Sequence, residues 1–343
     1  MVHHRCICPV GQGGFAIEEI DNYIVVYDCG SITSPQMVES CIDRLVRRTD
    51  HVNLLFISHF DKDHVNSLRY LLSNVRVLLT VTPMIPSELK WCYGVYINGG
   101  YTAIMDLLDE YHTERVFLGG IDNEERRFQT DKVWEWIAKS MMTQSDFDVL
   151  KYRLRINGLD LEQITNAYYV EEKKVLINNV FKDYFGPKGP NSKGLILLSQ
   201  HCNGVKTGRS HLGRGRYMFW YWYEYLFRIY PLNISKTTGE SSCLYVGDAD
   251  MRNIANNQAI QEFIKKYRTE QILQLMQIPH HGSRYSVGKN FEYNYQALYY
   301  FLNDRTTKRL QSNKALFLSL TTQNKLLVAR DVCQDLIFTK TVI

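Results

Sequence analysis

The sequence lacks the features that mark membrane-spanning and disulfide-rich proteins. Its longest aromatic and apolar run, residues 218–227, contains Glu224 and is too short to cross a bilayer. The 8 cysteines are scattered, and none forms a C-x-x-C pair. No long apolar stretch of the signal-peptide kind occurs near the amino terminus. We therefore expect a soluble, cytoplasmic protein with free thiols and no membrane partner.

The chain also lacks a strong net charge, internal repeats and low-complexity tracts. A formal charge of +4 permits a polyanionic partner without requiring one. The 343 residues allow one large domain or two ordinary ones, and a hydrophobic content of 45% is enough for a sizeable core. Strand and helix signals alternate in both halves, which predicts a mixed α and β protein.

Four residues of metal-ligand type follow a short apolar strand at 54–57. They are His59, Asp61, Asp63 and His64. A helix is expected directly afterwards, because the next apolar residues recur every three or four positions. Such residues in a polar loop are often only solvated, but four within six positions at a strand end favour a metal site. Imidazole with carboxylate suits zinc, manganese or iron better than calcium.

Two further groups of ligand-type residues also follow apolar strands. Asp248 comes after the strand expected at 243–246, and His280 and His281 come after the strand expected at 272–278. Strand ends of this kind can converge on one edge of a folded sheet. The three groups together offer enough ligands for two metal ions that share a carboxylate.

The other patterns predict the frame around this site. Further strands are expected at 15–20, 23–27, 76–82, 194–199 and 315–320, and further helices at 35–48 and 257–267. Residues 90–190 contain no ligand cluster, and we expect a helical insertion or lid there. Its expected helices are 102–111, 133–142 and most of 160–185.

The three groups in this order resemble the metallo-β-lactamase superfamily. The carrying motifs are His-x-Asp-x-Asp-His at 59–64, Gly-Asp at 247–248 and Pro-His-His-Gly-Ser at 279–283. With the turn at 10–13 they span most of the chain. The resemblance implies an α/β fold of the αββα type over residues 1–343, with two mixed β-sheets between helical layers and residues 90–190 inserted.

Within that superfamily, the chain is similar to the branch that contains the nuclease-like domain of ComEC-type competence proteins. Asp61 replaces the usual second histidine, as in that branch, and Val-Gly-Gln-Gly at 10–13 matches its turn. Tyr-Asp-Cys-Gly at 27–30 resembles its strand-ending Asp-x-Gly. The sequence departs from the branch at Pro9 and Gly14, where aspartates are usual, and it lacks the superfamily's additional histidine ligand.

The resemblance implies two divalent ions, Zn²⁺ or Mn²⁺, and assigns their ligands. The first ion would be held by His59 and Asp61, and the second by Asp63, His64 and His280 or His281, with Asp248 bridging the two. His280 is favoured as the ligand because it is nearer the strand, which leaves His281 to contact substrate; the sequence leaves this order open. Asp63, Asp248 and His281 are the expected catalytic residues.

A pair of ions of this kind can generate a hydroxide nucleophile and neutralise the charge of a phosphodiester. The sequence therefore predicts a metal-dependent hydrolase, above all a phosphodiesterase or nuclease acting on nucleic acid or nucleotides. Two alternatives stay open: hydrolysis of a small molecule such as a lactone or phosphate ester, and a binding or regulatory protein without turnover. The branch also implies a partner protein in bacterial defence or nucleic-acid processing.

Two further groups of residues are candidates for substrate contact. A glycine-rich basic stretch that includes Arg214 and Arg216 precedes an aromatic run at 217–223, and cations beside stackable rings suit single-stranded nucleic acid. Ser283 and Arg284 could hold a phosphate oxygen. The competing interpretations are a buried aromatic segment, a basic surface loop and a serine that only stabilises its turn.

Overall fold

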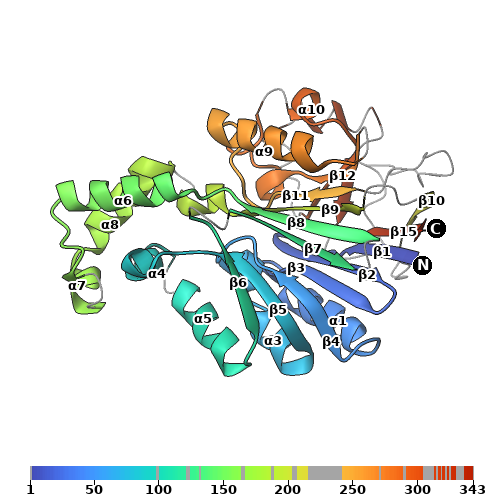
Figure 1. Ribbon diagram of the computed structural model, residues 1–343, viewed down its shortest axis with the longest axis horizontal. Coiled ribbons are helices and arrows are strands. Elements are labelled where there is room, and N and C mark those ends of the chain that lie inside the picture. Colours follow the sequence, from blue (N-terminus) through green and yellow to red (C-terminus); the bar gives the residue numbers. More distant parts are fainter. Residues whose placement is uncertain are drawn as a thin grey trace.

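A computed structural model shows two β-sheets packed face to face, with helices on the outer face of each (Figure 1). The expected αββα sandwich is therefore confirmed. The structure describes residues 2–97, 100–120, 124–130, 133–163, 167–186, 189–202, 207–214, 242–269, 272–288, 291–303, 313, 316–317, 319–320, 323, 326–329 and 336–342.

The first sheet has the strand order β10-β15-β1-β2-β3-β4-β5-β6. Its strands are β1 (Val2–Ile7), β2 (Gly13–Ile20), β3 (Tyr23–Ser31), β4 (His51–Phe56), β5 (Arg76–Pro83), β6 (Glu114–Leu118), β10 (Thr207–Arg214) and β15 (Leu336–Val342). From β3 to β6 all neighbours are parallel, because helical crossovers connect them, whereas β10, β15, β1, β2 and β3 alternate in direction.

The second sheet has the order β14-β13-β12-β11-β9-β8-β7. Its strands are β7 (Glu125–Thr130), β8 (Trp134–Ser140), β9 (Leu195–His201), β11 (Cys243–Tyr245), β12 (Leu273–Gln277), β13 (Ala297–Asn303) and β14 (Leu326–Ala329). The strands β11 to β14 are parallel, and β7, β8, β9 and β11 are antiparallel. Each sheet therefore has a parallel half whose carboxyl ends share one edge.

Helices cover both outer faces. Those nearest the first sheet are α1 (Pro35–Val46), α2 (Lys62–Val65), α3 (Leu68–Asn74), η1 (Ser87–Leu89), α4 (Lys90–Tyr96) and α5 (Gly100–Glu110). Those nearest the second sheet are η4 (Pro279–Gly282), α9 (Ile254–Tyr267) and α10 (Phe291–Asn294). In the described part of the chain, no helix combines the length and hydropathy that a membrane crossing requires.

The apolar core forms three layers, because alternate residues of each strand face opposite ways. In β3, Val25 and Tyr27 lie between the sheets, while Val26 packs towards the helices of the first sheet. In β9, Leu197 lies between the sheets and Leu198 packs towards α9. The apolar strands thus have two buried faces, which fixes their register in the sandwich.

The helix expected at 133–142 is wrong, because residues 134–140 form strand β8. Trp134 and Trp136 point into the layer between the sheets, whereas Ile137 points into the outer layer. With both faces buried, apolar residues occupy consecutive positions and the alternation typical of a strand is hidden.

The strand expected at 315–320 is also wrong. The described residues 316–317 and 319–320 are helical. Phe317 and Leu320 are buried and lie three positions apart, which places them on one helical face. The strand in this part of the sheet is β13, which the sequence analysis did not identify.

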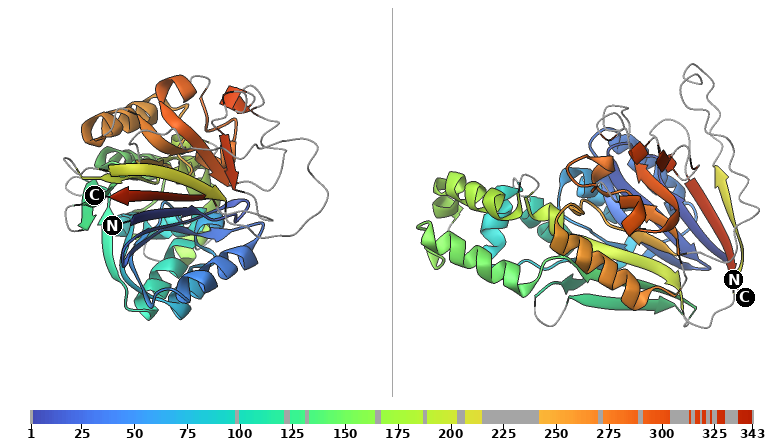
Figure 2. Two further views of the ribbon diagram at one scale, coloured as in Figure 1. Left: turned by 90° about the vertical axis from the view of Figure 1, so that its right-hand side faces the viewer. Right: turned by 90° about the horizontal axis from the view of Figure 1, so that it is seen from above.

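The region from 90 to 190 is less uniformly helical than expected. Its middle part supplies β6 to the first sheet, and β7 and β8 to the second. The later helices are α6 (Gln144–Ile156), α7 (Ala167–Glu172), α8 (Lys174–Phe185) and the short η3 (Gly189–Lys193). Figure 1 and the right panel of Figure 2 show α6, α7 and α8 as an arm beyond one end of the sandwich.

A buried polar cluster around Glu18 joins the two sheets. The Glu18 carboxylate accepts hydrogen bonds from Arg5 Nε at 2.6 Å, Tyr245 hydroxyl at 2.7 Å and Trp136 Nε1 at 2.9 Å. Ser199 also donates to it, and His3 Nε2 lies 3.2 Å away. Burial raises the pKa of Glu18, but the Arg5 and His3 interactions outweigh burial and hold it well below its usual range.

Substitution Glu18→Ala is expected to lower the free energy of unfolding by about 3–5 kcal/mol, because it leaves the Arg5 guanidinium buried without its counter-charge. The matched control is Glu19→Ala, since Glu19 pairs with the exposed Arg48 and should cost at most about 1 kcal/mol. Urea unfolding of the two variants checks this. Equal losses would contradict it.

The His3 imidazole makes stability depend on pH. Burial lowers its pKa to about 4, against about 6.5 in an unfolded chain. Between these values the unfolded chain binds a proton that the folded protein excludes, so stability is expected to fall as pH decreases from about 6.5 to about 4. As pH decreases across this range, the midpoint of urea unfolding should fall less steeply for His3→Gln than for the control His51→Gln. Equal slopes for the two variants would contradict the role of His3.

Candidate metal centre

Three loops at the carboxyl ends of strands bring the ligand-type residues together. Residues 57–61 and α2 follow β4, the loop with Asp248 follows β11, and η4 follows β12. The backbone N–H of His280 donates to the Gly247 carbonyl at 3.1 Å, which ties the second loop to the third. The N–H of Leu195 donates to the Ser58 carbonyl at 2.8 Å and ties the first loop to the second sheet.

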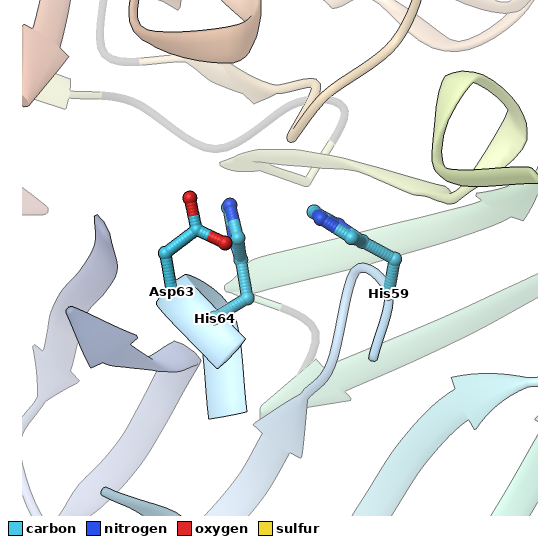
Figure 3. Close-up of side chains that lie close together, drawn as sticks. All are labelled: His59, Asp63 and His64. Atoms are coloured by element: carbon cyan, nitrogen blue, oxygen red, sulfur yellow. The ribbon is translucent and has the colours of Figure 1, made fainter. Parts of the chain in front are cut away.

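Five buried side chains form the centre of the site. His59, Asp63 and His64 place one ligand atom each within 4.8 Å of one another, and His64, Asp248 and His281 do the same. Figure 3 shows Asp63 and His64 rising side by side from α2, with the ring of His59 facing them from the loop. The structure therefore brings together ligand-type residues from all three sequence motifs.

Buried polar atoms without hydrogen-bond partners in the described part of the chain show that the clustered side chains fit a metal ion. Among the described residues, His59 Nε2, His64 Nε2 and Asp248 Oδ1 are buried polar atoms without a hydrogen-bond partner. His64 Nε2 lies 3.6 Å from Asp248 Oδ1, and His59 Nε2 lies 3.9 Å from Asp248 Oδ2. Two ligands of one tetrahedral zinc ion lie about 3.3 Å apart. Unpaired buried polar atoms are costly, and a shared cation would satisfy all three.

Asp28 and Ser58 hold both histidine rings in place. Asp28 Oδ2 lies 2.7 Å from His64 Nδ1 and accepts from the Ser58 hydroxyl at 2.8 Å, while Oδ1 accepts from the Ser58 N–H at 2.7 Å. Ser58 Oγ lies 2.9 Å from His59 Nδ1. With Nδ1 engaged, the Nε2 atom of each ring faces the site, which is the arrangement typical of metal-ligating histidine.

The glycine turn at residues 10–14 makes room for this contact. A Cβ atom on Gly14 would lie 2.8 Å from His64 Nδ1 and 2.9 Å from the Asp28 side chain. Any larger residue would push apart the hydrogen-bonded pair. The turn thus has a steric role at position 14, where the close approach of His64 and Asp28 favours glycine.

Backbone strain is concentrated at the same site. Asp28, His280 and His281 have φ of 57°, 48° and 50°, a left-handed conformation that costs a non-glycine residue about 1–3 kcal/mol. The double-histidine turn brings both rings to the site from one short segment, each beside an aspartate. His280 Nδ1 lies 2.9 Å from Asp248 Oδ2, and His281 Nε2 lies 3.3 Å from Asp63 Oδ2.

The two adjacent histidines differ in their surroundings. His281 is buried, belongs to the ligand cluster and has its Nδ1 2.9 Å from the Asn303 carbonyl oxygen. His280 is more exposed and contacts the Asp248 carboxylate. This geometry favours His281 as the metal ligand and His280 as the residue that faces solvent, the reverse of the order favoured from strand proximity.

Asp61 is placed differently from the other acidic residues. It stands just before α2, outside the two ligand clusters found in the described residues, and accepts a hydrogen bond from the side chain of Asn191 in η3 at 2.5 Å. A carboxylate oxygen held in this way can orient the other oxygen towards an ion. Asn191 was not identified from sequence, since nothing local marks it.

Two other residues of the site were also missed. Ser58 lies in the same loop as the predicted ligands, but a serine beside histidine carries no distinctive signal. Asn303 ends β13 beside the His281 strand, and its buried Oδ1 has no hydrogen-bond partner among the described residues. The strand-end argument that found Asp248 would have found Asn303 had β13 been predicted.

The charges of the cluster balance one another. Burial raises the pKa of Asp248, but His280, His64 and His59 outweigh burial and hold it well below its usual range. Burial lowers the pKa of His64, yet Asp28 and Asp63 raise it well above the ordinary value. The carboxylates of Asp63 and Asp248 are thus held ionised, the state that binds a cation. A bound cation would take the place of the His64 proton.

The predicted substrate-binding residues fall into two groups. Ser283 and Arg284 directly follow η4; Ser283 Oγ accepts the Tyr285 N–H at 3.3 Å, and Arg284 is exposed. Arg214 ends β10, whose side chains are not described, and Arg216 lies with the aromatic run at 217–223 outside the described residues.

Comparison with known proteins identifies no family by sequence. No family model matches the chain, and no curated protein matches it. Human tRNase Z, short form, superposes with a TM-score of 0.43 and 9% identity, over 96% of this chain and 97% of that one.

Two other solved structures align over shorter stretches. The chemotaxis sensor ODP, in a peroxy diiron species, gives a TM-score of 0.28 and 14% identity over 40% of this chain. The metallo-β-lactamase fold protein YhfI from Bacillus subtilis gives 0.27 and 11% over 41%. The chain spans 48% and 53% of their respective lengths. At these TM-scores the superpositions carry no argument, so the interpretation of the site rests on the chain's own geometry.

Proposed function

We propose that the protein is a metal-dependent hydrolase that cleaves phosphodiester bonds in nucleic acid or nucleotides. The observation that carries this proposal is a set of three buried atoms, on His59, His64 and Asp248, that face one another at the strand ends. None of them has a hydrogen-bond partner among the described residues. A rigid set of ligands from both sheets suits catalysis, because the geometry is held before substrate arrives.

The proposed ligands are His59, Asp63, His64, Asp248 and His281, with Asp61 supported by Asn191 as a further ligand. When bound, Zn²⁺ or Mn²⁺ ions lower the pKa of coordinated water and neutralise charge on the phosphate. The chain's own part is to fix the ligands through Asp28 and Ser58 and to exclude bulk water by burial. Asp63 and Asp248 are the residues proposed to orient a nucleophilic water.

His280 is proposed to act on the substrate. Its ring is partly exposed beside Asp248, so it can reach a phosphate oxygen or a leaving group at the mouth of the site. A histidine in this position can hold or donate a proton to the departing oxygen. His281 would then serve as ligand, with its ring oriented by the Asn303 carbonyl.

Cleavage assays test the proposal directly. Protein loaded with Mn²⁺ or Zn²⁺ is expected to cleave at least one of single-stranded DNA, duplex DNA, RNA and bis-p-nitrophenyl phosphate. Asp248→Asn should lower kcat/KM at least about a hundredfold, because it removes the charged ligand that faces His59 and His64. The control is Asp43→Asn, which alters a carboxylate in α1 that accepts a hydrogen bond from the Tyr70 hydroxyl. No cleavage by the wild type would favour a small-molecule hydrolase or a silent binding protein.

Metal affinity tests the role of Asp28 without relying on activity. Asp28→Asn cannot accept the Ser58 and His64 hydrogen bonds as the carboxylate does, so its affinity for Zn²⁺ is expected to fall about 10–100-fold. Competition with a chromophoric chelator measures this, again with Asp43→Asn as control. If both variants bound Zn²⁺ equally, Asp28 would have no part in orienting the ligands.

A further inference from the structure

The ring of Tyr285 lies beside two arginines, in the loops that carry Asp248 and His281. The guanidinium of Arg284 lies 4.8 Å from the centre of the Tyr285 ring, and that of Arg252 lies 5.6 Å from it. Arg284 Nη2 also donates to the Tyr285 hydroxyl at 2.6 Å. We call Arg252, Arg284 and Tyr285 the rim platform.

The rim platform belongs to the two loops that carry the metal ligands of the second sheet. Arg252 lies four residues after Asp248, and Arg284 lies three residues after His281. The N–H of Met251 donates to the Ser286 carbonyl at 2.9 Å, so a backbone hydrogen bond joins the two loops beside the platform. A movement of either loop would therefore move platform and ligands together.

The platform is accessible and carries net positive charge. Tyr285 keeps 49% of its surface exposed, so the guanidinium groups leave part of the residue free for another contact. Arg252 has a partial counter-charge in Asp250, 3.5 Å away. In the part of the chain that the structure describes, no carboxylate lies within ion-pairing distance of Arg284.

We propose that the rim platform binds the backbone and a base of single-stranded nucleic acid next to the metal centre. The inference rests on the proposed function and names its substrate class as a polynucleotide strand. Guanidinium groups bind phosphate oxygens through paired hydrogen bonds, and an exposed ring stacks on an unpaired base. The contacts with Tyr285 restrain both arginine side chains before binding, which lowers the entropy cost of ordering them.

Binding can be measured separately from turnover. The probe is a labelled phosphorothioate DNA strand of about twenty nucleotides, which keeps the backbone charge and resists cleavage. Fluorescence anisotropy with full-length, Mn²⁺-loaded protein gives the affinity. The double variant Arg252→Ala/Arg284→Ala is expected to bind at least about tenfold more weakly. A plot of log K against log salt concentration should have a slope that is shallower by about 1.4 for this variant. That difference corresponds to the loss of two phosphate contacts with a single strand.

A second variant separates stacking from charge. Tyr285→Leu keeps the net charge and an apolar side chain but loses the aromatic face, and it is expected to weaken binding about tenfold without changing the salt slope. The matched control is Arg48→Ala/Arg69→Ala, which removes two exposed arginines paired with Glu19 and Glu110. Circular dichroism checks that every variant is folded.

The outcomes separate this inference from the proposed function. Unchanged affinity in both platform variants, or equal weakening in the control, would overturn the platform. Preference of the wild type for duplex over single-stranded DNA would overturn the stacking contact. The binding measurement does not depend on cleavage. A protein that binds through the rim platform but cleaves nothing would therefore contradict the proposed hydrolase activity and leave the binding proposal intact.

Discussion

The hydrogen bonds accepted by Asp28 are the contacts on which the candidate site depends. One carboxylate holds the His64 ring and the Ser58 hydroxyl, and Ser58 in turn contacts His59. Both imidazoles are buried, so a ring free to rotate would place a polar nitrogen among apolar atoms at a high cost. The strained backbone at Asp28 is tolerated because these contacts determine its position from several sides.

The Glu18 cluster plays a comparable part between the sheets. It connects β1 and β2 of the first sheet to β8, β9 and β11 of the second through hydrogen bonds that require one relative position of the two. The candidate metal centre draws its histidines and aspartates from both sheets, so the distances between them depend on that alignment. A buried polar cluster of this kind is better explained by specificity of packing than by a large gain in stability.

The segment from α6 to η3 contacts the ligand-type residues through Asn191. Asn191 in η3 reaches Asp61, while the helices α6, α7 and α8 extend away from the sandwich (Figure 2). The expected helical insertion at 90–190 includes the three sheet strands β6, β7 and β8 in its middle part.

The sequence by itself determined the local features: the strand before His59, the ligand types after three strands, and the glycine turn at 10–14. Such features depend on residue spacing and on which residues end a strand, both of which are local. Only the tertiary structure decided that His281 is buried with Asp63, that Asn191 contacts Asp61 and that Asn303 ends a neighbouring strand. Those contacts join residues that are 22 to 218 positions apart in the sequence. Which of two adjacent histidines is buried depends on the backbone dihedral angles, and residue spacing does not specify these angles. The strand β8 was missed for a related reason, since burial on both faces removes the alternation by which a single sequence reveals a strand.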